Sequence, residues 1–179
     1  MSRVSVRQAH GFALIDLIFV CGVIGLLASI AMPSMFSAKQ SAASASAIAS
    51  MRTINSSQLT YALTCGSGFY APSLSRLGTA PPGSNAAFIG GGLGSADTVT
   101  KSGYIIQMSA SPFPGSPPSC NGAAAGEDGQ GYKAAADPTL PTVLRFFGTN
   151  PNTLIFEDTA TLFAAMPEAG EPATGHVIR

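Results

Sequence analysis

The chain has 179 residues and a formal net charge of +0; 46% of its residues are hydrophobic and only 10% are charged. This length suggests one domain with an appended segment, and the neutral charge gives no broad basic surface of the kind that binds nucleic acid. Glycine and proline are frequent after residue 65. We therefore expect a small, loop-rich domain attached to an apolar segment, with no nucleic-acid partner.

The apolar segment runs from Phe12 to Met32 and contains a single charged residue, Asp16. As a helix rising about 1.5 Å per residue, it would be roughly 31 Å long, which matches the thickness of a bilayer core. Two arginines precede the segment, and Lys39 is the next basic residue after it. The positive-inside rule then places residues 1–10 in the cytoplasm and the chain after Pro33 outside.

Two simpler interpretations of this segment stay open. A cleaved signal peptide normally has an apolar region of about 7–15 residues that ends near small residues. The present segment is longer, and Asp16 interrupts its start, although Ser29-Ile30-Ala31 would serve as a weak cleavage site. The other interpretation is an uncleaved anchor.

The start of the segment resembles the N-terminal signal of type IV pilins and type II secretion pseudopilins. In that family a short basic leader ends in glycine, and phenylalanine then opens a long apolar helix with an acid at its fifth position. A proline follows about one bilayer length later. Gly11, Phe12, Asp16 and Pro33 occupy these places here, and the match extends from Gly11 to about Ser34. The family usually has glutamate where this chain has Asp16.

The resemblance implies that prepilin peptidase cuts between Gly11 and Phe12 and so removes the leader, residues 1–11. It also implies that Phe12 is then N-methylated. It implies insertion in the inner membrane as a single pass with a cytoplasmic N-terminus. It also implies partners: other copies of the chain, other pilins and an inner-membrane assembly platform. After assembly the subunit would lie in a filament at the cell surface or in the periplasm.

The resemblance also offers a role for Asp16 as an assembly residue. In filaments of the family this acid is thought to meet the terminal amine of a neighbouring subunit, which here would be that of Phe12. An unpaired carboxylate at mid-bilayer costs about 2.5–3.5 kcal/mol on insertion scales, and less near the interface. The alternative is therefore an acid tolerated at the membrane surface, where the helix dipole also favours an anion in the first turn.

Residues 34–64 contain no glycine or proline and are rich in alanine, which predicts that the helix continues beyond a kink at Pro33. The sequence divides the helix into a transmembrane and assembly part, 12–33, and an amphipathic part, 34–64. Apolar residues fall on or near one face of the second part: Ile48, Met51, Ile54, Leu59 and Leu63. Asn55 and Gln58 fall largely elsewhere, and glycines after residue 65 supply the stop signal.

The globular part, 65–179, is expected to contain short antiparallel strands. Strand candidates are 103–109, 131–137, 143–149 and 152–158, and a helical turn is expected at 73–77. The glycine-rich stretch 88–97 lacks the ending of a phosphate loop and is interpreted as an ordinary loop. We expect the tail, 160–179, to cover the domain as irregular chain. The predicted fold is α+β and pilin-like, with a long N-terminal helix packed on a small antiparallel sheet.

The globular part offers little that points to catalysis. Cys65 and Cys120 would lie in an oxidising compartment, which permits a disulfide between them, with two separate thiols as the alternative. His176 has no metal-ligand spacing with them, and no Gly-x-Ser-x-Gly elbow is present. The acids of 126–131 suggest either a calcium loop or, preferably, a solvated turn. We expect no enzyme activity, metal or cofactor.

These observations predict a structural subunit of a type IV pilus-like filament. The nearest alternative is a pseudopilin or minor pilin of a type II secretion or DNA-uptake machine. An alternative of a different class is a membrane-tethered binding or enzyme domain whose N-terminus matches the signal by accident.

Overall fold

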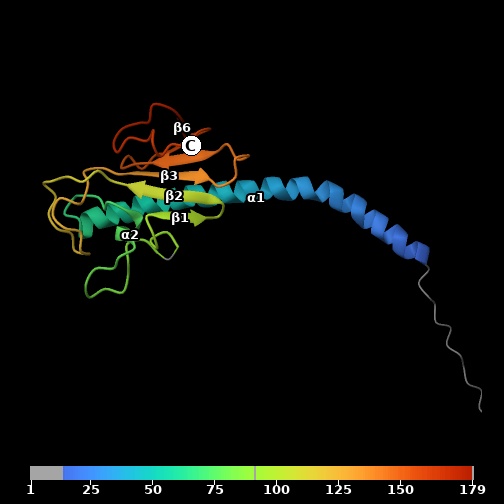
Figure 1. Cartoon of the computed structure of the whole chain (residues 1–179), viewed down its shortest axis with the longest axis horizontal. Helices are drawn as coiled ribbons and strands as arrows, with labels where there is room; N and C mark the ends of the chain where they lie inside the picture. The colour runs from blue at the N-terminus through green and yellow to red at the C-terminus, as the bar shows by residue number, and fades with distance from the viewer. Residues whose placement is uncertain (1–13, 91, 179) are drawn as a thin grey trace, which may run out of the picture. The chain divides into compact units, whose positions relative to one another are not determined.

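The computed structural model describes residues 14–90 and 92–178 and shows a long helix followed by a six-stranded antiparallel sheet (Figure 1). Helix α1 spans Leu14–Thr64 and the short helix α2 spans Leu74–Leu77. The strands are β1 (Thr98–Lys101), β2 (Tyr104–Ser109), β3 (Lys133–Pro138), β4 (Phe146–Thr149), β5 (Ile155–Asp158) and β6 (His176–Val177). The α+β class and the helix packed on a small antiparallel sheet are confirmed.

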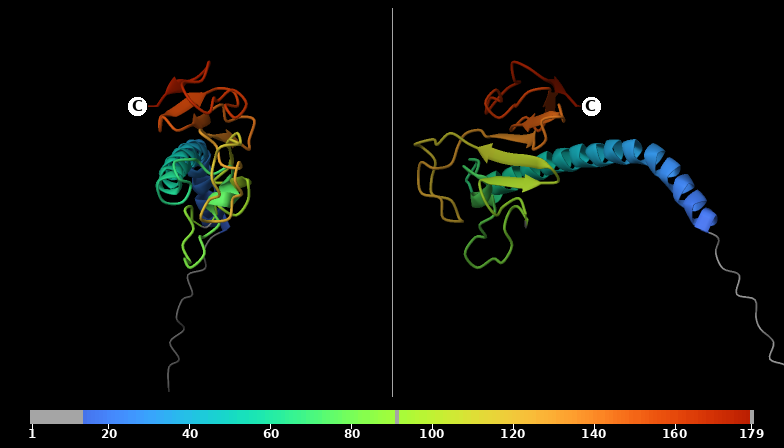
Figure 2. Two further views of the ribbon diagram at one scale, coloured as in Figure 1. Left: turned by 90° about the vertical axis from the view of Figure 1, so that its left-hand side faces the viewer. Right: turned by 45° about the vertical axis from the view of Figure 1, so that its right-hand side comes forward.

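The chain divides into two compact units, Met1–Gln40 and Ser41–Arg179. The second unit, called the head below, contains the last part of α1 and the whole sheet. The strands lie in sequence order, β1 to β6, and each pairs antiparallel with the next. Within the head, α1 lies along one face of this sheet (Figure 2).

The buried face of α1 in the head repeats every three or four residues, as expected for a helix packed on one side. The buried residues at this spacing are Ser44, Ala47, Met51, Ile54, Gln58 and Tyr61, and Cys65 continues the series directly after the helix. The apolar ones share a core with side chains of β2, β3 and β4, namely Tyr104, Ile106, Met108, Ala134, Ala136 and Phe147. On β2 burial alternates along the strand, so that every second side chain faces α1.

The predicted apolar face of α1 was wrong at its C-terminal end. Leu59 and Leu63 are 51% and 76% exposed, whereas Asn55 and Gln58 are buried. The reason is that the buried amides are hydrogen-bonded. The Asn55 amide donates to Thr149 Oγ1 at 2.9 Å, and Gln58 exchanges two hydrogen bonds of 2.9 Å with the backbone of Ala71. A satisfied amide can occupy a core position that hydrophobicity alone would give to leucine.

Four of the six strands were predicted, with ends that differ by up to three residues, and the helical turn at 73–77 corresponds to α2. Strand β1 was missed because it is short and lies at the sheet edge, with Val99 as its one buried residue. It joins β2 through a two-residue turn in which Ser102 and Gly103 both have positive φ, 52° and 81°. Such a turn matches the twist of a tight hairpin.

The C-terminal segment covers the sheet face opposite α1. Ala135, Gly148 and Phe156 are cross-strand neighbours, and Leu162 and Met166 pack with Phe156 in a second apolar cluster. A Cβ atom at position 148 would lie 3.1 Å from Leu162 Cβ, so glycine is what allows this close packing. Residues 160–179 were expected to be irregular chain, and among the described ones this is wrong at β6. The two residues of β6 are too few to give a strand pattern in the sequence.

Candidate functional site

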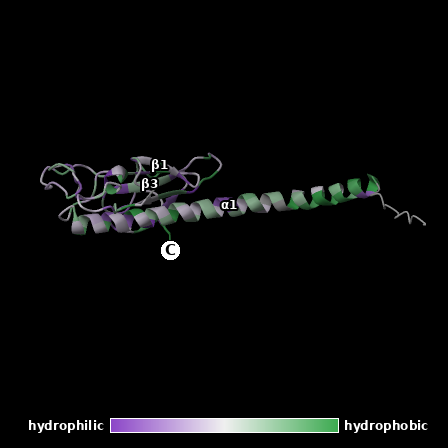
Figure 3. Ribbon diagram, turned by 90° about the horizontal axis from the view of Figure 1, so that it is seen from below, coloured by the Kyte–Doolittle hydropathy of each residue, from purple (hydrophilic) through white to green (hydrophobic). Residues whose placement is uncertain are grey.

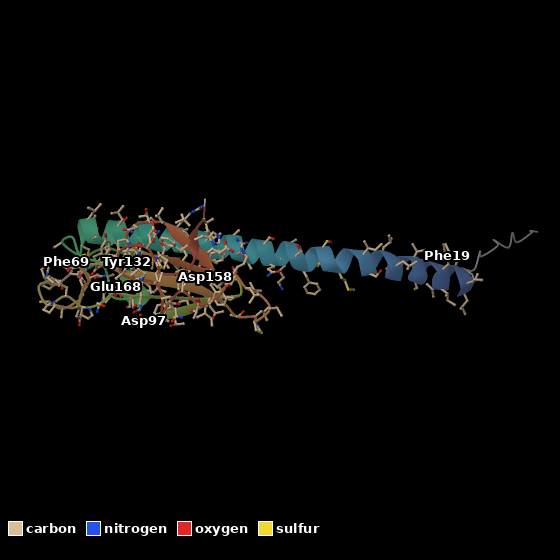
Figure 4. All side chains as sticks on the ribbon, turned by 90° about the horizontal axis from the view of Figure 1, so that it is seen from above. Phe19, Phe69, Asp97, Tyr132, Asp158 and Glu168 are labelled. Atoms are coloured by element: carbon tan, nitrogen blue, oxygen red, sulfur yellow. A yellow bond between two sulfur atoms is a disulfide. The ribbon has the colours of Figure 1, made fainter. Side chains whose placement is uncertain are left out.

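The first half of α1 exposes its apolar side chains on every side. Large apolar residues between Leu14 and Phe36 are between 40% and 77% exposed in the single chain. Figure 3 shows this end of the helix as its most hydrophobic part, and Phe19 projects from it in Figure 4. An apolar surface of this size on a soluble protein marks contact with a membrane or with another protein.

The same half of α1 is long and apolar enough to cross a membrane. An 18-residue window has a mean hydropathy of 2.5, and none of that window is buried within the described part of the chain. A core helix of a soluble protein would be mostly buried, so this explanation does not apply here. An N-terminal signal sequence has similar composition, but here the helix continues without a break into the head.

Asp16 lies in the first turn of the described helix, exposed among exposed apolar side chains. The next charged residue along the chain is Lys39, more than six helical turns later. Within residues 14–90 and 92–178 no salt bridge to Asp16 is present. Gly11 and Phe12, the predicted sites of cleavage and methylation, lie outside the described residues. The structure therefore describes Asp16 but not Phe12, whose amine is its predicted partner in a neighbouring subunit.

At Pro33 the backbone of α1 is helical on both sides. The predicted kink at this residue stays a prediction.

Cys65 and Cys120 form a disulfide, as predicted, with their Cα atoms 4.9 Å apart. Cys65 follows directly after the last residue of α1, and the backbone amide of Cys120 donates to the Cys65 carbonyl at 3.3 Å. The bond therefore fixes the loop between β2 and β3 to the end of the helix. The remaining cysteine, Cys21, is exposed on the apolar half of α1.

The acids of 126–131 have separate structural roles. Glu127 accepts a hydrogen bond from the Ala124 amide at 2.9 Å, and its carboxylate lies 3.7 Å from Arg76. Asp128 is fully buried and accepts from the Tyr61 hydroxyl at 2.9 and 3.1 Å. The predicted solvated turn is therefore wrong for Asp128. Among the described residues, no three His, Cys, Asp or Glu side chains are grouped in a way that could hold a metal ion.

Asp128 was missed in the sequence because a single acid between glycines carries no sign of burial. In the structure its carboxylate is the hydrogen-bond partner that permits Tyr61 to be buried on α1. Burial raises the pKa of Asp128 above its ordinary value of 3.8, and burial also raises the pKa of Tyr61. The folded head therefore favours the protonated form of this carboxyl.

The raised pKa of Asp128 gives a pH-dependent prediction. Asp128→Asn keeps an oxygen acceptor for Tyr61 and cannot ionise. The unfolded carboxyl titrates at about 3.9. As the pH rises from this value through the higher pKa of Asp128 in the folded head, the carboxyl ionises and the parent should become less stable. The Asn variant should not lose this stability. The variant should gain, relative to the parent, about 1.4 kcal/mol for each unit by which folding raises the pKa.

Urea unfolding of the full chain in detergent at pH 4 and pH 7 measures this difference. Asp128→Ala provides the control, because it removes the acceptor and should be destabilised at both pH values. If the free-energy difference between parent and Asn variant is the same at pH 4 and pH 7, the inferred pKa shift is wrong.

An open pocket of about 450 Å³ lies beside α2. It is lined by Pro72, Ser73, Ser75, Arg76, Thr79, Pro112 and Glu127. Its polar groups bond to the surrounding chain, since Arg76 donates to the Asn121 carbonyl and Ser75 donates to Asp97. His176 is on β6 and does not line the pocket. The lining residues thus hold the loops together and form no nucleophile–base pair.

Comparisons with protein-family models, with curated proteins and with solved structures each found no match. The chain's own residues define a class of protein by its build: a disulfide-bonded α+β head, continuous with a helix whose first half is long and apolar enough to span a membrane.

Proposed function

We propose that the chain is a structural subunit of a type IV pilus-like filament, inserted in the inner membrane and polymerised through α1. The observation that carries the proposal is the single 51-residue helix, which is apolar and exposed in its first half and forms part of the head core in its second. A helix of this kind can be held by lipid before assembly and by neighbouring helices afterwards, because both environments bury the same apolar side chains.

Asp16 supports a filament over a plain anchor. An anchor does not need an acid in its membrane segment, whereas a filament subunit needs a feature that sets its register against its neighbour. After cleavage, the Phe12 amine of one subunit and the Asp16 carboxylate of the next would neutralise each other in the apolar core. Such a pair is more useful for specificity than for stability.

The resemblance of residues 11–34 to a prepilin signal implies the steps that come before and after this pairing. Prepilin peptidase cuts after Gly11, Phe12 is methylated, and the inner-membrane assembly platform adds the subunit to a filament of like and related pilins. The filament extends into the periplasm or to the cell surface. The head supplies the outer surface, and its disulfide suits an oxidising compartment.

Two other functions compete with this proposal. A pseudopilin or minor pilin of a type II secretion or DNA-uptake machine would have the same helix, and Asp16 in place of the usual glutamate, together with the small head, leaves this alternative open. A membrane-tethered binding or enzyme domain would keep its leader. The mature N-terminus separates the tether from the other two functions.

Gly11→Val tests the proposal directly. We expect the variant to keep residues 1–11 and to be excluded from filaments, because the peptidase must fit a residue with almost no side chain at the cut. Intact-mass spectrometry of protein from native membranes gives the readout: the parent should begin at a methylated Phe12 and the variant at Met1. Ser5→Val, the same kind of change far from the cut, should be processed normally. A parent chain that still carries its leader would refute the filament proposal, and a processed Gly11→Val variant would refute the cleavage site.

A further inference from the structure

The two cysteines of the disulfide differ in their access to solvent. Cys65 is 6% exposed and belongs to the hydrophobic core of the head, together with Tyr61 one turn earlier on α1. Cys120 is exposed and lies in the loop between β2 and β3, which passes beside the C-terminal end of α1 (Figures 1 and 2). A molecule that approaches the disulfide from solvent therefore meets the Cys120 side first.

The exposed position of Cys120 is held by hydrogen bonds that do not involve the disulfide. Cys120 is the second residue of a tight turn, in which the Ser119 amide donates to the Ala123 carbonyl at 3.0 Å. The next residue, Asn121, is 5% exposed, and its side chain donates to the Arg76 carbonyl of α2 at 2.7 Å. These bonds fix the turn against α2, so Cys120 should keep its place when the disulfide is open.

Cys65 is in a poor position to react first with a molecule from solvent. The thiolate is the attacking form of a cysteine, and cysteines buried among apolar side chains are inert because a thiolate there is not solvated. Cys65 also follows directly after the last residue of α1, where the negative end of the helix dipole disfavours an anion. Both effects are absent at Cys120, which lies in an exposed turn.

We propose that Cys120 is the entry point for thiol–disulfide exchange in the head. The partner is a thiol–disulfide oxidoreductase of the compartment in which the head folds, and its mixed disulfide forms with Cys120 and not with Cys65. The inference uses contacts within the head only, so it applies equally to a filament subunit and to a tethered domain.

The proposed oxidation has two exchange steps. The Cys120 thiolate attacks one sulfur of the oxidant's disulfide, and the oxidant's other sulfur leaves as a thiolate. The Cys65 thiolate then attacks Cys120 Sγ, and the bond between Cys120 and the oxidant breaks. Two electrons pass from the two cysteines to the oxidant, and the two protons that the cysteines lose end on its thiols.

The burial of Cys65 does not prevent the second step, because that step takes place within the head. The Cα atoms of the two cysteines are 4.9 Å apart, and the Cys120 amide donates to the Cys65 carbonyl at 3.3 Å. This arrangement keeps Cys65 beside the mixed disulfide and makes its attack effectively unimolecular.

Peptide mapping of the native chain tests the inference, in a Cys21→Ser background that removes the remaining cysteine. The full chain in detergent, with its disulfide intact, is treated briefly with reduced glutathione and then quenched with acid. Because exchange is reversible, the sulfur that carries the glutathione is the one that also reacts with an oxidant. We expect glutathione on Cys120 and none on Cys65. An adduct on Cys65, or the absence of an adduct on Cys120, would overturn the inference.

Single-cysteine chains measure how much of the difference comes from folding. In the same background, Cys65→Ser leaves only Cys120 and Cys120→Ser leaves only Cys65. Each chain is treated with glutathione disulfide, and intact-mass spectrometry gives the reaction rate in buffer and in concentrated urea. Dividing the first rate by the second corrects for the local sequence around each thiol.

We expect this ratio to be at least about tenfold larger for Cys120 than for Cys65, because only the fold buries Cys65. Equal ratios in variants that keep the near-ultraviolet circular dichroism of the parent would contradict the proposed entry point. If a variant unfolds, the mapping of the native chain decides.

Discussion

Asp16→Ala should be inserted in the membrane and processed, yet fail to enter filaments. In the proposed assembly the Asp16 carboxylate neutralises the Phe12 amine of a neighbouring subunit. Removing one partner of a buried pair leaves the other charge uncompensated and costs about 3–5 kcal/mol. A loss of this size at every subunit contact is a hundredfold or more in association and should prevent a filament from growing.

Two further substitutions separate charge from shape at this position. Asp16→Asn keeps the size of the side chain and loses the anion, so it should fail as Asp16→Ala does. Asp16→Glu keeps the anion and adds one methylene, the length usual in the family that the N-terminus resembles, so it should assemble at least as well as the parent.

The amount of sheared filament, divided by the amount of subunit left in the membrane, measures the outcome for all three variants. Head folding is the internal control, because Cys65–Cys120 forms far from Asp16 in sequence and should be present in every variant. Parental filament yields from both Ala and Asn would mean that Asp16 has no role in assembly and that the acid is tolerated at the membrane surface.

Removing the disulfide should cause the largest loss of head stability. Its cysteines are separated by 55 residues. Closing such a loop restricts the unfolded chain by about 4 kcal/mol on the chain-entropy model, a large share of the 5–15 kcal/mol typical of a domain. The double variant Cys65→Ala/Cys120→Ala should therefore unfold at a clearly lower urea concentration than the parent.

Urea unfolding in detergent, followed by the near-ultraviolet circular dichroism of the head tyrosines, provides the measurement. Cys21→Ser is the matched control, because Cys21 is exposed on the other unit and its loss should leave the unfolding midpoint unchanged. Reducing the parent should reproduce the double variant. Equal midpoints for parent and double variant would show that other contacts, such as the Cys120 amide to the Cys65 carbonyl, already close the loop.

The sequence by itself determined the features that depend on neighbours along the chain. A run of apolar residues without clusters of glycine or proline predicts a long helix whatever surrounds it, and α1 indeed spans Leu14–Thr64. The strands β2 to β5 were predictable for the same reason, because turn residues bound each apolar run. The pairing of Cys65 with Cys120 was predictable because these are the two cysteines expected outside the membrane, in an oxidising compartment.

Only the tertiary structure decided which side of the helix is buried in the head and what the polar residues there do. Asn55 and Gln58 are in the core because Thr149 and Ala71, distant in sequence, supply their hydrogen bonds. Asp128 is buried for the same reason, through Tyr61. No local pattern encodes these partners, since a polar side chain is acceptable in a core only when the fold brings it a matching group. Leu59 and Leu63 are exposed because they lie outside the arc of α1 that holds the buried Ile54, Gln58 and Tyr61.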